Sequence, residues 1–114
     1  MVRTLAARLA DMADAIAEIE SMLATHDYES FAAQKQVQWA VERGLEIISE
    51  SSRAIPKEQK AAFSHIPWQR IAGLGNMLRH EYQHIEPRLI WNIAREHLGE
   101  LRPVVCSLQK IADK

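Results

Sequence analysis

Cysteine is almost absent from this sequence, and glycine and proline are scarce. The single cysteine, Cys106, excludes an intrachain disulfide and a zinc site built from several thiolates. Four glycines and four prolines in 114 residues leave long stretches without a helix breaker.

Long hydrophobic runs are missing as well. No stretch approaches the ~18–20 apolar residues of a membrane-spanning helix, and acidic residues follow Met1 too early for the apolar core of a signal peptide. A composition of 47% hydrophobic and 25% charged residues is ordinary for a globular protein. We therefore expect a soluble, cytoplasmic protein with no membrane association.

An excess of positive charge is also missing. The formal net charge of −1 excludes a protein that binds nucleic acid through a basic surface as a whole. Arginines and glutamates of the C-terminal half nearly cancel one another. If this protein handles RNA, it does so through a local site.

Apolar side chains recur at helical spacing along the whole chain, and no stretch shows convincing strand alternation. Several helix starts coincide with a proline, whose missing N–H costs nothing there. The spacing predicts helices over about 5–23, 28–48, 56–64, 67–84 and 87–111, the second of them fraying over 49–53.

These helices predict an all-α fold of one domain over residues 1–114. Four of them are long and the connections are short, which favours an up-and-down four-helix bundle with an extra short helix. Within the last helix, Pro103 should cause a kink or a break.

The fourth predicted helix carries a polar cluster. On a helical wheel at ~100° per residue, Asn76 and His80 fall opposite the apolar side, and Arg79 lies between the two sides. An imidazole can take or give the proton of a ribose 2′-hydroxyl, and an arginine can hold a phosphate. The cluster therefore suits metal-independent phosphodiester chemistry, although such clusters are also common on solvated helix faces.

Two glycines, Gly73 and Gly75, lie inside the same helix, where each costs roughly 1 kcal/mol relative to alanine. Glycine at such positions indicates that a helix or a ligand approaches the backbone closely. The neighbour is either another helix of the same chain or a second copy.

The stretch 66–82, IPWQRIAGLGNMLRHEY, resembles the HepT-like branch of the HEPN superfamily. Trp91 in the next helix and the segment 40–50, AVERGLEIISE, extend the resemblance over essentially the whole chain. It implies a HEPN-like bundle and the toxin ribonuclease of a bacterial toxin–antitoxin pair.

The hallmark of that branch is an arginine, then four to six residues, then a histidine with a tyrosine two residues on. His80 and Tyr82 match the histidine and tyrosine, and Asn76 matches an asparagine that often follows the arginine. The arginine position itself is Gly75. Arg79 could replace it, or an arginine of a second subunit could.

A third alternative is a catalytically weakened helical dimer that only binds a nucleotide or a nucleotidyltransferase. For the active form, the resemblance implies a homodimer with its motifs at a shared groove, an RNA substrate and no cofactor. It also implies an antitoxin of type VII systems, the minimal nucleotidyltransferase MntA. That enzyme would silence the toxin by adenylylation of the motif tyrosine, here Tyr82.

A rival interpretation comes from the pattern H-E-x-x-H at 80–84, the signature of zinc metalloproteases. The sequence offers no strand for a substrate-binding edge, and a third ligand would have to be Glu96 or His97. The tryptophans do not separate the alternatives, since at helical spacing they favour core or interface positions: Trp39, Trp68 and Trp91.

Overall fold

Helices and one short 3₁₀ turn make up the computed structural model, which describes residues 4–113 apart from the side chain of Tyr82. No strand occurs in this part of the chain, which confirms the all-α class. The elements are α1 (Leu5–Ala24), α2 (Tyr28–Ala32), α3 (Lys35–Ser52), α4 (Lys57–Ala62), α5 (Trp68–His80), η1 (Tyr82–His84) and α6 (Pro87–Ala112).

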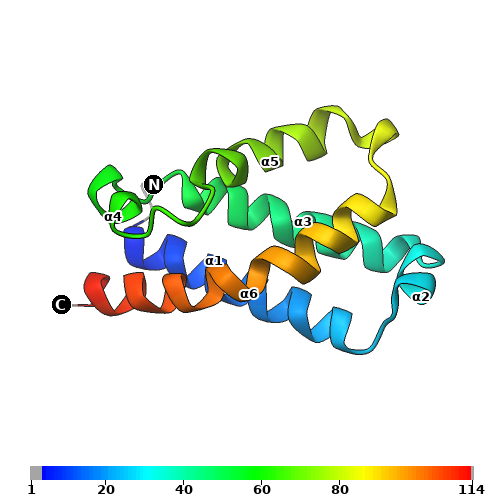
Figure 1. Cartoon of the computed structure of the whole chain (residues 1–114), viewed down its shortest axis with the longest axis horizontal. Helices are drawn as coiled ribbons and strands as arrows, with labels where there is room; N and C mark the ends of the chain where they lie inside the picture. The colour runs from blue at the N-terminus through cyan, green and yellow to red at the C-terminus, as the bar shows by residue number, and fades with distance from the viewer. Residues whose placement is uncertain (1–3, 114) are drawn as a thin grey trace.

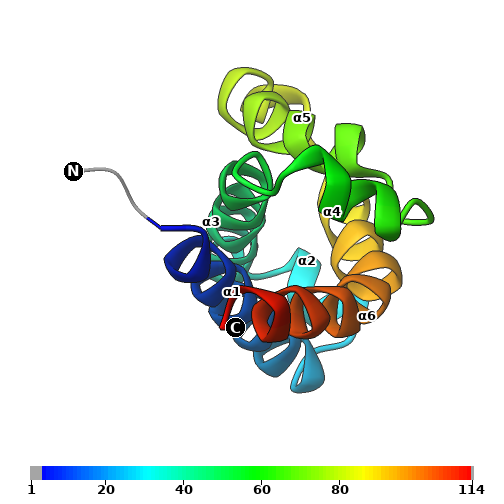
Figure 2. The ribbon, with the colours of Figure 1, turned by 90° about the vertical axis from the view of Figure 1, so that its left-hand side faces the viewer.

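Four long helices form the predicted HEPN-like bundle (Figure 1). α1 packs between α3 and α6, and α5 lies along the other side of α3. The helices α5 and α6 make few close backbone contacts, and we call the line where they face one another the open seam. In the view of Figure 2, α4 lies in front of this seam. Among residues 4–113, no helix has the length and apolar character that crossing a membrane requires.

The core lies where α1 meets α3 and α6. Four side chains of α1 are at most 1% exposed and follow the three- and four-residue spacing of an amphipathic helix: Leu9, Met12, Ile16 and Ile19. On α3, Gly44 faces Ile19 so closely that a Cβ at position 44 would lie 2.8 Å from Ile19 Cδ1. The missing side chain therefore allows α1 and α3 to approach.

The second predicted helix is interrupted, because α2 ends at Ala32 and α3 begins at Lys35. Asp27 and Ser30 start α2 with a capping box: Asp27 Oδ1 accepts from the Ser30 N–H at 2.8 Å, and Ser30 Oγ accepts from the Asp27 N–H at 3.1 Å. At the other end, Gln38 Nε2 donates to the carbonyl of Phe31 at 2.9 Å. Side chains thus form hydrogen bonds with backbone N–H and C=O groups that would bond to one another in a continuous helix.

The predicted fraying over 49–53 is wrong, since α3 continues to Ser52. Ser49, Ser51 and Ser52 are all buried, and Ser52 Oγ donates to the Ser49 carbonyl at 2.7 Å. Small buried side chains here let another helix come close.

Pro103 does not break the last helix, because α6 is continuous to Ala112. Figure 1 shows α6 bending partway along its length, which agrees with the predicted kink. The apolar side chains beyond the proline explain the continuity: Val104, Val105 and Leu108 are buried.

We expect Gly44→Ala to be less stable than Gly99→Ala by about 1–3 kcal/mol. Both changes gain the same helix propensity, but only the Cβ at position 44 meets a buried side chain, whereas that at Gly99 has no atom within 4 Å. Denaturant unfolding measures the difference. Equal stability of the two variants would show that Ile19 gives way at no cost.

Candidate active site on helix α5

A polar contact joins α3 to α5 directly at the backbone. Ser49 Oγ accepts from the Gly75 N–H at 2.9 Å and donates to the Ala72 carbonyl at 3.1 Å. Arg53 Nη2 donates to the same carbonyl at 2.7 Å. A Cβ at position 75 would lie 3.0 Å from Ser49 Oγ, so glycine is what permits this approach. Gly75 is therefore explained by packing inside the chain.

The guanidinium of Arg79 folds back along α5 toward this contact. Arg79 Nη1 lies 3.3 Å from the point where a Cβ at position 75 would be. No carboxylate of residues 4–113 forms an ion pair with Arg79, which is exposed. A cationic group thus reaches the space where a side chain at position 75 would begin.

Asn76 and His80, predicted to lie on the outer face of α5, are both exposed. Arg79, predicted to lie between the outer and the apolar side, is exposed as well. Leu78, on the opposite side of the helix, is 3% exposed. Residues three and four apart are neighbours on a helix surface, so Asn76 adjoins both Arg79 and His80.

α5 ends earlier than predicted, at His80 rather than near residue 84. The Glu81 N–H donates to the Met77 carbonyl at 2.9 Å, and the chain then enters the turn η1. Tyr82 begins this turn, but its side chain lies outside the described residues. His80 therefore occupies the exposed last turn of a helix, where its imidazole has access to a large substrate.

The end of α5 also separates the two histidines of the H-E-x-x-H pattern. His80 is helical, whereas His84 lies in the 3₁₀ turn, so they are not presented four residues apart on one α-helix. Within residues 4–113, no group of three histidine, cysteine or acidic side chains is placed to hold a metal ion. The geometry of a zinc metalloprotease is not formed.

Sequence reasoning missed the contribution of α3. Glu42, Glu46, Ser49 and Arg53 follow one another at four, three and four residues, which places them on one stripe of α3. Ser49 and Arg53 hold α5, and the two glutamates continue the stripe toward the N-terminus of α3. These four residues could have been identified from the sequence, because they are polar residues at helical spacing within an apolar pattern.

The two glutamates repel one another. Partial burial raises the pKa of the Glu42 carboxyl above its usual value, and the charge of Glu46 raises it further. Glu46 itself pairs with Arg43, with Arg43 Nη1 3.6 Å from Glu46 Oε2. Negative charge on this stripe is thus partly compensated within α3.

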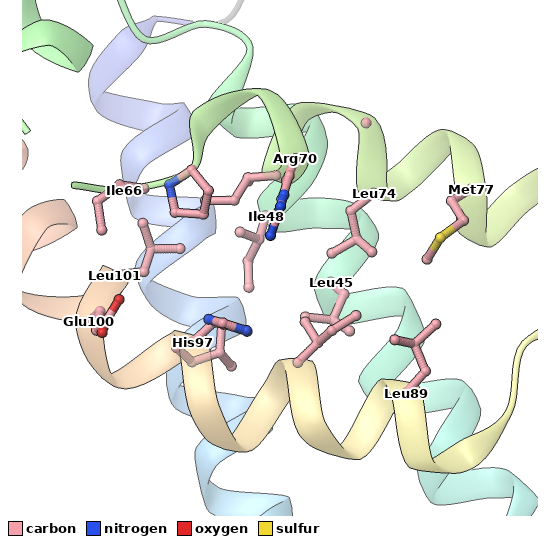
Figure 3. Close-up of a pocket in the computed structure, with 15 residues that line it drawn as sticks. Leu45, Ile48, Ile66, Arg70, Leu74, Met77, Leu89, His97, Glu100 and Leu101 are labelled. Carbon is pink, nitrogen blue, oxygen red and sulfur yellow. The ribbon is translucent and has the colours of Figure 1, made fainter. Parts of the chain in front are cut away.

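The open seam between α5 and α6 holds a cavity of about 440 Å³ (Figure 3). Leu45 of α3, Leu74 of α5 and Leu89 of α6 face the same space. Arg70 and His97 are polar members of the lining, which is otherwise mostly apolar. The cavity does not include His80, so it is separate from the polar cluster.

Comparison with known proteins gives a consistent result. Residues 12–108 match the family described as "Ribonuclease HepT-like". A protein of Thermococcus cleftensis named "Probable ribonuclease HepT" is 35% identical over 102 residues, covering 90% of this chain and 93% of that protein. A "Putative RNase" of Methanocaldococcus jannaschii is 33% identical over 103 residues, covering 90% and 94%. No solved structure matches the chain.

We expect Glu42→Gln to stabilise the protein near pH 7 but not near pH 4. The folded state binds the Glu42 proton more tightly than the unfolded chain, so this group's contribution to stability is lost as pH rises through its ordinary and folded pKa values. Glutamine keeps the shape without the charge. Thermal unfolding of Glu42→Gln and of the exposed control Glu50→Gln, at both pH values, measures the effect; a gain of equal size at both would contradict it.

Proposed function

The chain belongs to the HepT-like ribonuclease family, and we propose that it is the toxin of a type VII toxin–antitoxin pair, a cytoplasmic endoribonuclease that needs no metal ion. The observation that carries this proposal is that His80 and Arg79, in the last turn of α5, are both exposed, and that the Arg79 guanidinium forms no ion pair with a carboxylate of residues 4–113. An acid–base group and a phosphate-binding group thus come from one turn of one helix.

In the proposed reaction, the imidazole of His80 takes the proton of a ribose 2′-hydroxyl. The 2′-oxygen then attacks the adjacent phosphorus, and the bond from phosphorus to the 5′-oxygen breaks. The leaving 5′-oxygen takes a proton from water, and the imidazolium of His80 returns its proton to the hydroxide that is left. The products are a 2′,3′-cyclic phosphate and a 5′-hydroxyl. Arg79 stabilises charge on the non-bridging oxygens, and Asn76 supplies an amide donor beside both groups.

The geometry supports Arg79 as the replacement for the arginine that the family motif has at position 75. Its Nη1 atom lies 3.3 Å from the start of the path that a side chain at 75 would follow. An arginine of a second subunit is the other source of the same charge. A module that binds a nucleotide or a nucleotidyltransferase without cutting is the alternative function, and the absence of an arginine at 75 favours it.

We also propose a homodimer that joins through α5. Gly75 does not support this dimer, because the contact with Ser49 inside the chain already requires a glycine there. Gly73 supports it. This residue is exposed and a Cβ there would meet no atom within 4 Å, so nothing inside the chain requires a glycine at position 73. Leu89, 43% exposed beside the seam, adds apolar surface for a second copy.

The proposed antitoxin is a minimal nucleotidyltransferase of the MntA type that adenylylates Tyr82. Tyr82 follows His80 by two residues, in the turn that ends α5. An AMP group there would bring bulk and negative charge to a site proposed to bind RNA phosphate, and would repel the substrate.

We expect the protein to cleave RNA in the presence of a chelator, and His80→Ala to lower the rate by roughly 10²–10⁴. Arg79→Ala should cost roughly 10²–10³, since it removes charge stabilisation. The matched control is His65→Ala, an exposed histidine that lies before the start of α5, at the opposite end of this helix from His80. Equal cleavage by the parent and by His80→Ala would contradict the proposed ribonuclease. If the parent cuts no RNA but binds a nucleotide or the transferase, the alternative function of a non-cutting binding module is supported instead.

Incubation with a minimal nucleotidyltransferase of the MntA type and ATP should add adenylate to Tyr82. Mass spectrometry of peptides locates the group, and Tyr82→Phe should remain unmodified because it has no hydroxyl. Tyr28, the other tyrosine, serves as the internal control. Adenylate on other residues alone would rule out the proposed silencing.

Sedimentation at about micromolar concentration should show a dimer for the parent and a monomer for Gly73→Arg, because a large charged side chain would enter the proposed interface. Gly99→Arg, at an equally open helix position on α6, should remain dimeric. A monomeric parent protein would contradict the interface, as would a dimer unaffected by Gly73→Arg.

A further inference from the structure

Two arginines of α6 lie against aromatic rings. Figure 1 shows that α6 begins at the end of the bundle where α5 finishes, the end at which α2 also lies. The guanidinium carbon of Arg88 lies 3.6 Å from the ring centroid of Tyr28 in α2. That of Arg95 lies 5.2 Å from the centroid of Trp91. The Tyr28 and Trp91 rings meet edge to face, with centroids 6.0 Å apart.

This aromatic support is anchored in the core. Trp91 is 9% exposed, and its ring centroid lies 5.2 Å from that of the fully buried Phe31. The capping box at Asp27 and Ser30 holds the start of α2, which carries Tyr28 and Phe31. A guanidinium stacked on such a ring loses freedom before it meets a ligand, while its N–H edges stay available to an anion.

Neither arginine is neutralised within the described chain. No carboxylate of residues 4–113 forms an ion pair with Arg88 or Arg95, and both are exposed. Arg102, the next member of the same seven-residue row on α6, differs because its Nε lies 3.3 Å from Glu20 Oε1. The two guanidiniums are therefore exposed cations without an ion-pair partner in residues 4–113, on a chain of net charge −1.

We propose that Arg88 and Arg95 bind the phosphate backbone of the RNA and extend the substrate-binding surface from α5 onto α2 and α6; this rests on the proposed ribonuclease function. Seven residues of helix separate them by about 10.5 Å on one face, so each meets a different phosphate of a single strand. RNA is favoured over a protein partner because the surface offers preoriented, unpaired charge at the end of the bundle that carries His80.

The test measures binding apart from cutting. His80→Ala protein is titrated with a labelled, mixed-sequence single-stranded RNA at several salt concentrations. Adding Arg88→Gln and Arg95→Gln should weaken binding roughly tenfold at low salt and reduce the slope of log K against log salt by about 1.4, or ~0.7 per lost phosphate contact. Arg102→Gln, whose guanidinium is already paired, should change neither quantity appreciably.

Two further variants test the aromatic support and guard against misfolding. Tyr28→Leu should weaken binding because Arg88 loses the ring, and Tyr28→Phe should restore it because the ring face remains. Arg88→Lys with Arg95→Lys should keep the salt slope, since the charge is retained. If the glutamine pair fails to fold, equal binding by Tyr28→Leu and Tyr28→Phe overturns the proposal.

The outcomes separate this surface from the ribonuclease claim. Equal affinity and slope for the glutamine pair and Arg102→Gln overturn the surface even where the parent cuts RNA. Normal RNA binding by the glutamine pair with an altered oligomer overturns it too, and assigns the arginines to a protein contact. An arginine-dependent slope in a parent that never cuts RNA supports the surface and refutes the ribonuclease.

Discussion

The contact of Ser49 with the backbone of α5 decides how the rest of the site is presented. One hydroxyl accepts from Gly75 and donates to Ala72, so α3 and α5 approach to a distance that only glycine at position 75 allows. Since the buried side of α5 is thereby defined, its outer side is defined too. His80 and Arg79, in the last turn of α5, are exposed because of this orientation of the helix.

Helical spacing of apolar residues was enough to predict the class, the bundle and the side of α5 that is buried, because burial of one face dominates helix packing. Two local features were beyond it. The gap after Ala32 depends on the side chain of Gln38 bonding to a carbonyl seven residues earlier, which no propensity encodes. The serines of α3 have short polar side chains typical of helix ends, yet here they are buried in a close helix contact.

Within the site, the polar cluster on α5 could be predicted because it lies within one helix. There, the spacing of residues in the sequence determines which side chains lie on the same face. The partners from α3 were not predictable, since they are far from α5 in sequence: Ser49 lies 26 positions from Gly75, and Arg53 lies 19 positions from Ala72. The glycine at the family's arginine position also acquires a physical meaning. It is required by Ser49, and the guanidinium one turn later bends into the space it leaves.

The open seam has a consequence for how this chain can vary. α5 is attached along α3 and has few close backbone contacts with α6, so the contact of Ser49 with Gly75, which orients α5, does not involve the α6 side chains that line the cavity. Substitutions at Leu89 or Ile93 can therefore change what the cavity accommodates while the contact that orients α5 is kept.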